Sequence, residues 1–215
     1  MNYEVKIVSH PESGRAAFSK GLLDRAKKRA EENVRIFESI ISPETPLLGI
    51  EPSAILSFKD EYLRIVNTEL KAMAKEIAEN VLLIDEFIAR EIHQGRIQSS
   101  SFTKAPKTIK LHGHCHQKAL TNVEDSLWML SLPENFTVEQ IPSGCCGMAG
   151  SFGYEKEHFQ ISQQIGELVL FPTVRAANQD TLIASTGTSC RHQIADGTGR
   201  KALHPIEILY EALNK

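Results

Sequence analysis

The sequence predicts an α/β protein built around a mostly parallel sheet. Short apolar or alternating segments, typical of strands, are followed by longer segments with apolar residues at intervals of three or four, typical of amphipathic helices. This order recurs along all 215 residues, and helices that cross over between strands are how parallel strands are connected. We therefore expect two Rossmann-like βα units, which a chain of this length can accommodate.

Residues 1–93 are expected to form the first unit. In chain order we predict a strand at 3–8, a turn at 10–14, a helix at 19–41, a strand at 47–50, a loop at 51–54 and a helical region at 58–91. Ser19 can cap the first helix, and Pro43 ends it. The helical region is too long for one ordinary helix, and Asn67 and Asn80 are its predicted breaks.

Residues 94–107 are polar and predict the connection to a second unit at 108–215. The expected elements of the second unit are a strand at 108–112, a loop at 112–117, a helix at 118–132, a strand at 138–142, a loop at 143–154, a helix at 155–170 with a continuation at 174–178, a strand at 181–184, a loop at 185–192 and a helix at 205–213. Each of the three loops therefore follows a strand.

All four cysteines lie in these three loops. Cys115 follows the first strand, Cys145 and Cys146 follow the second, and Cys190 follows the third. Because parallel strands end at one edge of their sheet, the thiols are expected to converge there. The spacing C-x29-C-C-x43-C is neither that of a ferredoxin nor that of a paired zinc ribbon. An iron–sulfur cluster and a structural zinc therefore both remain open, as do four inert buried thiols, which we rank lower.

The loop at 143–154, S-G-C-C-G-M-A-G-S-F-G-Y, is the strongest single motif. Glycine reaches backbone angles that other residues avoid, so Gly144 and Gly147 predict a tight loop around the cysteine pair. The loop also precedes a helix, whose first turn favours anionic groups. We expect both glycines to help bind a cofactor. Direct thiol redox chemistry at the pair ranks last, since adjacent cysteines form a strained ring when oxidised.

Basic and histidine side chains flank the thiols: His112, His114, His116, Lys118, Arg191 and His192. The histidines could ligate a metal, relay protons or hydrogen-bond to loop carbonyls, and we favour the last of these. The two cations could balance thiolate charge or simply face solvent.

An internal repeat is predicted from two similar layouts. Matching Ser13-Gly14 to Cys146-Gly147 places Ala54 opposite Cys190, with separations of 41 and 44 residues. The match puts three residues without thiols where the second unit has cysteines: Glu12, Ser13 and Ala54. We therefore predict an internal duplication whose first copy is degenerate and serves as a scaffold.

The bulk composition excludes several classes of function. A formal net charge of −3 gives no basic footprint for nucleic acid, and no apolar run approaches the length of a membrane span. The first residues alternate and lack the apolar core of a signal peptide, so we expect a cytoplasmic protein. In that compartment four cysteines favour metal or redox chemistry over disulfides.

Three segments resemble a known family: H-C-H-Q-K-A-L, G-C-C-G-M-A-G-S-F-G-Y-E and G-T-S-C-R-H-Q-I. They look like the cysteine-rich CCG domain that occurs in heterodisulfide reductases and in the iron–sulfur subunit of glycolate oxidase. The domain also ends large FAD-linked dehydrogenases that oxidise 2-hydroxy acids such as D-lactate or D-2-hydroxyglutarate. The resemblance covers nearly the whole chain, and S-K-G-L-L-D with G-I-E-P-S supports a degenerate first CCG repeat in residues 1–93.

The resemblance implies that Cys115, Cys145, Cys146 and Cys190 hold metal, with a [4Fe-4S] cluster expected first and zinc as the alternative. It implies an iron–sulfur electron-transfer module, or else a zinc-binding scaffold without a redox role. The implied partners are a flavoprotein that carries FAD and a ferredoxin-like domain, with peripheral association with a membrane quinone system also open. Nothing in the chain resembles a flavin site, so we expect no dehydrogenase activity from it alone.

The sequence departs from the family pattern in two places. The first copy lacks the cysteines that the family carries there, and Gln193 stands where heterodisulfide reductases add the last cysteine of a C-x-x-C ending. The resemblance therefore implies neither a cluster in the first copy nor a five-cysteine site.

Overall fold

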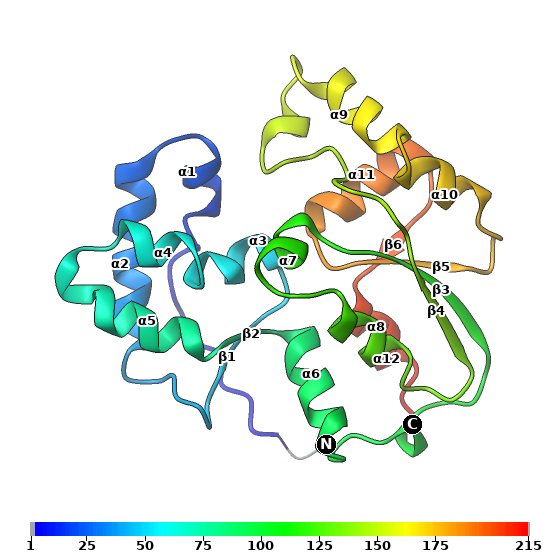
Figure 1. Ribbon diagram of the computed structural model, residues 1–215, viewed down its shortest axis with the longest axis horizontal. Coiled ribbons are helices and arrows are strands. Elements are labelled where there is room, and N and C mark those ends of the chain that lie inside the picture. The colour runs from blue at the N-terminus through cyan, green and yellow to red at the C-terminus, as the bar shows by residue number, and fades with distance from the viewer. Residues whose placement is uncertain (1–2, 215) are drawn as a thin grey trace.

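The computed structural model describes residues 3–214, which form two groups of elements, each around its own parallel sheet (Figure 1). The first group has two strands in the order β1-β2. The second has four, in the order β4-β3-β5-β6. All the strand pairs within these sheets are parallel. The predicted α/β class with parallel sheets is confirmed, while the internal duplication stays a prediction.

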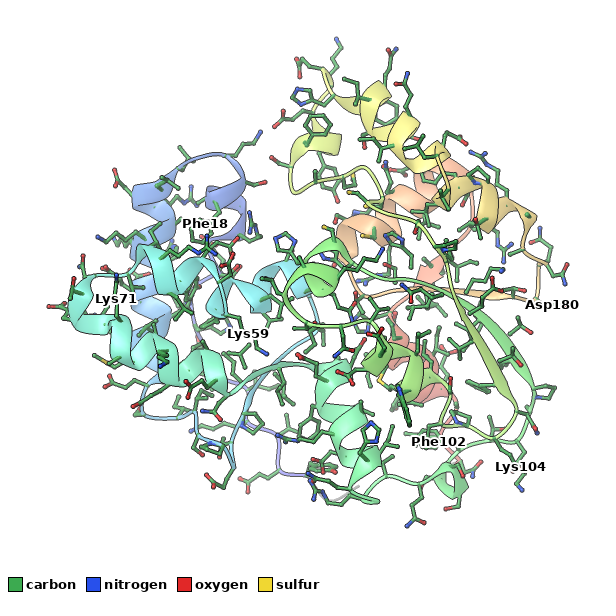
Figure 2. All side chains as sticks on the ribbon, in the orientation of Figure 1. Phe18, Lys59, Lys71, Phe102, Lys104 and Asp180 are labelled. Carbon is green, nitrogen blue, oxygen red and sulfur yellow. The ribbon has the colours of Figure 1, made fainter. Side chains whose placement is uncertain are left out.

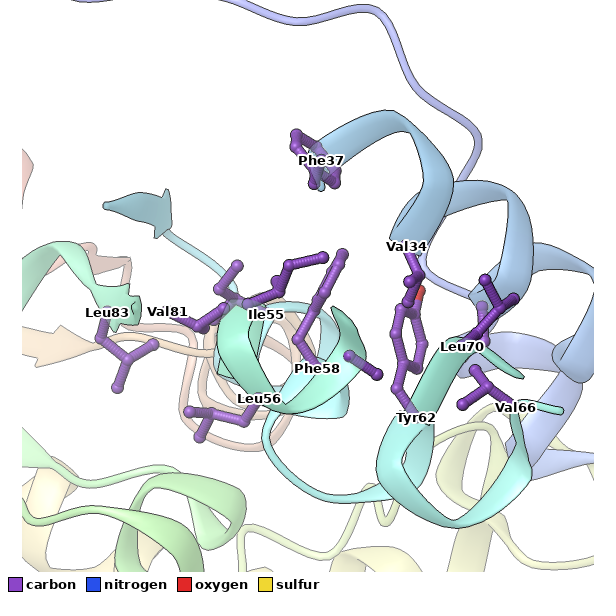
Figure 3. Close-up of a cluster of buried hydrophobic side chains, with 13 residues drawn as sticks. Val34, Phe37, Ile55, Leu56, Phe58, Tyr62, Val66, Leu70, Val81 and Leu83 are labelled. Atoms are coloured by element: carbon purple, nitrogen blue, oxygen red, sulfur yellow. The ribbon is translucent and has the colours of Figure 1, made fainter. Parts of the chain in front are cut away.

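The first group runs from residue 3 to residue 83. Its elements are α1 (Arg15–Ser19), α2 (Leu23–Phe37), β1 (Leu47–Gly49), α3 (Pro52–Ile55), the 3-10 helix η1 (Leu56–Phe58), α4 (Glu61–Ile65), the 3-10 helix η2 (Thr68–Leu70), α5 (Lys71–Glu79) and β2 (Val81–Leu83). The buried stripe of α2 meets α4, α5 and η1 in one hydrophobic core (Figure 3). Phe37, Phe58 and Tyr62 stack in this core, with the last two ring centroids 4.4 Å apart.

Three expectations for this group need correction. Residues 3–8 form no strand: Val5 and Ile7 are 80% and 93% exposed, because alternation alone supplies no partner strand. The helix expected at 19–41 is the shorter α2, and Ser19 does not cap it: Ser19 ends the unpredicted α1, and the chain turns at Gly21 with φ 69° before α2 begins. Strand β2 lies inside the predicted helical region, directly after Asn80. The predicted breaks at Asn67 and Asn80 are confirmed.

The second group holds the remaining elements. They are α6 (Ile84–His93), the 3-10 helix η3 (Ser99–Ser101), β3 (Lys107–His112), α7 (Cys115–Leu120), α8 (Glu124–Leu130), β4 (Phe136–Gln140), the 3-10 helix η4 (Phe152–Tyr154), α9 (Phe159–Glu167), α10 (Leu170–Ala176), β5 (Leu182–Ser185), α11 (Thr188–Thr198), β6 (Ala202–Leu203) and α12 (Pro205–Glu211). One hydrophobic core packs α6, α8 and α12 on the sheet, and another packs α10 and α11 on it. The sheet therefore lies between two helical layers (Figure 1).

Helix α6 comes from the part of the chain that we assigned to the first unit, but it packs on α8 and α12 of the second group. Its Ile88 belongs to the same buried cluster as Ile109 of β3. The hydrophobic core of the second group thus begins before residue 93. The division of the chain into two separate domains remains a prediction.

Two predicted loops are largely helical. Cys115 opens α7, and Cys190 lies in the first turn of α11, so the loops at 112–117 and 185–192 are shorter than expected. The helix expected at 155–170 begins only at Phe159 and is followed by a separate α10, and the short strand β6 was missed. The N-termini of α7 and α11 therefore lie closer to the strand ends than predicted, and that of α9 lies farther away.

The two groups meet around α7, which contacts α3 and η1. Figure 2 shows the side chains of both groups, with Phe18 and Lys59 marking the first and Phe102 and Asp180 the second. Among residues 3–214, no helix is both long and apolar enough to cross a membrane.

Candidate metal centre

Three neighbouring strands deliver the four cysteines to one place. Strand β3 pairs with β4 on one side and with β5 on the other, so the segments that follow these strands leave the same sheet edge together. Cys115, Cys145, Cys146 and Cys190 line one cavity of about 730 Å³. None of the four forms a disulfide. The thiols converge in the structure as expected. Their role as metal ligands stays a prediction.

The four thiols lie close enough to shift one another's pKa values. Hydrogen bonds from Cys115 and then from Cys146 lower the pKa of Cys145. A hydrogen bond from Cys146 lowers the pKa of Cys190, to which the nearby His112 ring also contributes. The donors Cys115 and Cys146 have raised pKa values because of these same bonds and their burial. The charge on one sulfur therefore affects the others, and a metal binds cysteine as the thiolate.

Only one of the two predicted glycines is required by the backbone. Gly147 has φ 106°, and a Cβ there would lie 2.2 Å from the carbonyl oxygen of Ser162. Its amide donates a hydrogen bond to Cys145 Sγ over 3.3 Å. Gly144 has open space where a Cβ would be. The loop geometry therefore depends on Gly147, and whether either glycine binds a cofactor stays a prediction.

The two cations beside the thiols anchor loop carbonyls. Lys118 Nζ donates to the carbonyl oxygens of Ser143 and Gly144 at 2.6 and 3.0 Å, and burial lowers its pKa. Arg191 Nη1 donates to those of Ser185 and Thr186 at 3.0 and 2.7 Å. Both side chains thus fix the segments that carry the cysteines, a role that the sequence did not reveal.

Each of the four flanking histidines has a ring nitrogen paired within the protein. His114 Nδ1 accepts the amide of His116 over 3.1 Å and so caps α7. His116 Nε2 lies 3.3 Å from Arg15 Nη1, and burial lowers the pKa of this histidine. His192 Nδ1 lies 2.9 Å from the Tyr154 hydroxyl. None of these partners is a loop carbonyl, so the hydrogen bonding that we expected of these histidines is not what the structure has.

His112 differs from these three. Its Nδ1 lies 2.7 Å from Ser143 Oγ, while its Nε2 is buried and has no hydrogen-bond partner among residues 3–214. One ring nitrogen of His112 and the sulfurs of Cys146 and Cys190 all lie within 4.8 Å of one another. A second group with this spacing comprises His114, Cys115 and His116. The sulfur-rich, nitrogen-containing donor set suits thiophilic metals such as zinc or iron.

The first group of elements also lines the thiol cavity, which the sequence did not predict. Glu12, Ser13 and Ala54, the residues matched to cysteines, face the same cavity as the thiols. The predicted match between Ser13-Gly14 and Cys146-Gly147 was the one signal in the sequence for this arrangement. Two related loops that face each other would line the same cavity. The first group therefore forms part of the site and is more than a distant scaffold.

Glu51 makes a direct contact between the groups. Its Oε2 accepts the amide of Thr188, the first residue of α11, over 2.7 Å. Burial raises the pKa of this carboxyl, but hydrogen bonds from Thr188 and Ser53 outweigh it and leave the pKa lowered. A carboxylate is thus held at the helix N-terminus that carries Cys190, where the peptide dipoles favour negative charge.

Comparison with known proteins gives distant relatives along nearly the whole chain. The chain is 26% identical over 215 residues to D-2-hydroxyglutarate dehydrogenase of Escherichia coli and 25% identical over 214 residues to the enzyme of that name from Pantoea ananatis. Each match covers 99% of this chain but 20% of the relative. The chain is also 27% identical over 194 residues to one subunit of the anaerobic glycerol-3-phosphate dehydrogenase of Escherichia coli, a match that covers 90% of this chain and 47% of that relative.

No family model matches the chain, and no solved structure matches it. The chain spans about a fifth of the length of the D-2-hydroxyglutarate dehydrogenases and about half that of the glycerol-3-phosphate dehydrogenase polypeptide. The similarity therefore relates this chain to one region of larger oxidoreductases, in agreement with the coarser part of the predicted resemblance.

Proposed function

We propose that this chain is an iron–sulfur electron-transfer module or subunit of a flavin-dependent 2-hydroxy-acid dehydrogenase, of the D-lactate, glycolate or 2-hydroxyglutarate type. The observation that carries the proposal is the convergence of four thiols from three adjacent strands on one cavity. The distant similarity to D-2-hydroxyglutarate dehydrogenases and to part of a glycerol-3-phosphate dehydrogenase supports the reaction class. We assign residues 108–215 to a CCG-type repeat that carries the site, and residues 1–93 to a degenerate one.

In this proposal Cys115, Cys145, Cys146 and Cys190 hold a [4Fe-4S] cluster, which would accept and release single electrons. The chain itself would position and tune the thiolates. The Gly147 amide donates to Cys145 Sγ, and Lys118 and Arg191 hold the segments on which the cysteines lie. Hydrogen bonds to sulfur and the burial of the site are the means by which a protein sets a cluster's potential.

The proposal assigns the removal of hydride to a flavoprotein partner or domain that carries FAD. A ferredoxin-like domain would lie between that flavin and this chain, and a quinone or another carrier would receive the electrons. We place the assembly in the cytoplasm, with peripheral association at a membrane quinone system as one arrangement.

A structural zinc in a non-catalytic assembly domain is the second candidate. It is favoured by the compactness of His112, Cys146 and Cys190, whose donor atoms lie within 4.8 Å of one another. Three donors of this kind with a fourth nearby thiol resemble the four-ligand N/S sites typical of structural zinc.

Metal analysis of anaerobically purified protein tests the proposal. We expect iron and acid-labile sulfide in comparable amounts, a broad visible absorption that dithionite bleaches, and an EPR signal from the reduced protein. Stoichiometric zinc without visible absorption would support the second candidate instead. Protein that contains neither metal after anaerobic loading with iron and sulfide or with zinc would contradict both.

A turnover assay tests the division of labour. Purified chain, supplied with D-lactate or D-2-hydroxyglutarate and a dye acceptor, should show no oxidation, because the chain is proposed to receive electrons from a flavoprotein. Addition of a flavoprotein dehydrogenase to the same mixture should reduce the cluster. Oxidation of a hydroxy acid by the chain alone would overturn this division.

A further inference from the structure

Within residues 3–214, His112 is the one histidine beside the thiols that has a buried ring nitrogen without a hydrogen-bond partner. It is 0% exposed, and its Nε2 has no hydrogen bond within residues 3–214. A buried polar nitrogen without a partner costs free energy, so most such groups in folded proteins are paired. The neighbouring donors are the sulfurs of Cys146 and Cys190, which are 3% and 2% exposed.

The orientation of the His112 ring is set by its backbone pairing and by one side-chain contact. His112 ends β3, where its backbone pairs in register with Ser185 of β5. Ser143 Oγ meets Nδ1 over 2.7 Å, and the Ser143 carbonyl is itself held by Lys118 Nζ. When Nδ1–H donates to the serine hydroxyl, the Nε2 lone pair is left free. This is the arrangement of histidines that ligate metals, whose other ring nitrogen donates to a second group.

The distances agree with binding to a common metal. Bonds of about 2.0 Å to nitrogen and about 2.3 Å to sulfur separate two ligand atoms in a tetrahedral site by roughly 3.5–3.8 Å. The three donor atoms of His112, Cys146 and Cys190 lie within 4.8 Å of one another, so a small movement of side chains would bring them onto one ion.

We propose that His112 is a ligand, through Nε2, of the metal at the buried end of the thiol site, and that Ser143 is its positioning residue. This inference rests on the proposed metal centre and extends its ligand set beyond the four cysteines. The competing arrangement is an Nε2–H group that donates a hydrogen bond to a metal-bound sulfur. It has the same neighbours but places no nitrogen on the metal.

The deciding experiment detects nitrogen bound to metal in the unsubstituted chain. Protein labelled with 15N only in histidine is loaded anaerobically with iron and sulfide, reduced, and studied by pulsed EPR. The zinc-loaded protein is studied by X-ray absorption at the zinc edge. We expect a strongly coupled histidine nitrogen in the first case, or a nitrogen shell at about 2.0 Å beside the sulfur shell in the second.

Variants then assign the nitrogen. His112→Gln should remove the nitrogen signal and weaken metal retention, whereas His204→Gln should leave the signal intact. His204 is a matched control because it is also buried, but both its nitrogens are paired, Nε2 with Ile50 O at 2.9 Å and Nδ1 with the Ile206 amide at 3.1 Å. Thermal melting shows whether each variant is folded.

Ser143→Ala tests the positioning role with a milder change. We expect metal to be lost to a chelator about tenfold faster, and Ser143→Thr to restore the rate because it keeps the hydroxyl. A merely structural serine would change melting without changing the nitrogen signal or the chelation rate.

The outcomes separate the two proposals. Suppose that metal binding is lost in Cys146→Ser but that no metal-bound nitrogen is detected in the unsubstituted chain or in His112→Gln. This result would overturn the histidine ligand and would still support the thiol centre. A chain that binds neither iron nor zinc would overturn both. A nitrogen signal that survives in folded His112→Gln would exclude His112 as its source.

Discussion

The two groups of elements present similar loops to one cavity, but only one group supplies thiols. Gly14, before α1, has φ 78°, and Gly147, in the cysteine loop, has φ 106°. Helix α3 follows β1 as α11 follows β5, and Ala54 lies in α3 where Cys190 lies in α11. These likenesses support the predicted duplication without establishing it.

The groups also differ in how buried polar atoms stabilise these loops. In the first group Asn33 Nδ2 donates to the Tyr62 hydroxyl over 2.9 Å, and that hydroxyl donates to the Ser13 carbonyl over 2.8 Å. Charged groups also hold this loop, because Glu12 accepts the Gly14 amide and forms an ion pair with Arg29 at 3.3 Å. The Ser13 loop is thus stabilised by hydrogen bonds and an ion pair within the protein.

In the second group, buried polar side chains run from Asp85 through Ser126 to Gln117, which is on α7 with Cys115. Ser126 Oγ donates to Asp85 Oδ2, Gln117 Nε2 donates to Ser126 Oγ over 2.8 Å, and Thr186 Oγ1 donates to Gln117 Oε1 over 3.3 Å. The thiol site therefore rests on a network that includes a buried carboxyl, and this makes its stability sensitive to pH.

The sharpest way to test the contrast is to remove one thiol. Cys146→Ser should lower bound metal about tenfold or more, because a missing thiolate opens the site, and should abolish the rise in melting temperature on metal loading. Cys190→Ser should behave alike. Ser13→Ala, at the matched position of the first group, should change neither quantity appreciably. Metal per chain and thermal melting check all three. Normal metal content in Cys146→Ser would remove that thiol from the site.

A second test concerns the glycine loop. Gly147→Ala should lower the free energy of unfolding by about 3 kcal/mol, since a side chain there combines a left-handed backbone with a clash against the Ser162 carbonyl. Gly144→Ala is the matched control and should cost little, because open space surrounds that position. Urea unfolding of the metal-free proteins measures both. Equal effects from the two substitutions would contradict the assigned geometry.

The buried carboxyl provides a pH test. Burial raises the pKa of Asp85 to about 6, above an unfolded value of about 3.9. Between these values the folded chain binds more protons than the unfolded chain, so stability falls as pH rises from about 4 to about 6. Asp85→Asn should therefore unfold with a free energy about 2 kcal/mol higher than the unsubstituted chain at pH 7, and this advantage should vanish near pH 4.

Ser57→Ala serves as the control for that experiment, since Ser57 is buried and uncharged and its Oγ donates to the Ser53 carbonyl over 3.0 Å. Its cost should be the same at both pH values. Urea unfolding at pH 4 and pH 7 gives the comparison, and an Asp85→Asn advantage that persists undiminished at pH 4 would show that burial of the charge is not its cause.

The smallest expected effect is at the contact between the groups. Glu51→Gln should lower the free energy of unfolding by about 1.5 kcal/mol at pH 7, because the Thr188 amide loses a charged acceptor. The pKa of Glu51 is lowered in the folded chain, so its contribution is present above about pH 4.3 and is lost as pH falls through the folded value. The two proteins should therefore converge in acid. Glu79→Gln, on the exposed surface of α5, should be neutral throughout.

The alternation of strands and helices and the parallel class could be predicted from the sequence. So could the placement of the four cysteines after three strands: Cys115, Cys145, Cys146 and Cys190. These features follow from local patterns, because the spacing of apolar residues and the positions of turn residues can be recognised within short stretches of sequence. The breaks at Asn67 and Asn80 belong to the same class.

Which groups meet at the site could not be predicted, because this depends on how distant segments pack in the folded chain. The free nitrogen of His112, the anchoring by Lys118 and Arg191, and the carboxylate of Glu51 at α11 are contacts between segments distant in the chain, for which sequence spacing carries no signal. Residues 3–8 show the converse, because an alternating segment becomes a strand only when a neighbour pairs with it. Hydrogen-bond partners and strand partners are chosen by packing, and packing is a property of the whole fold.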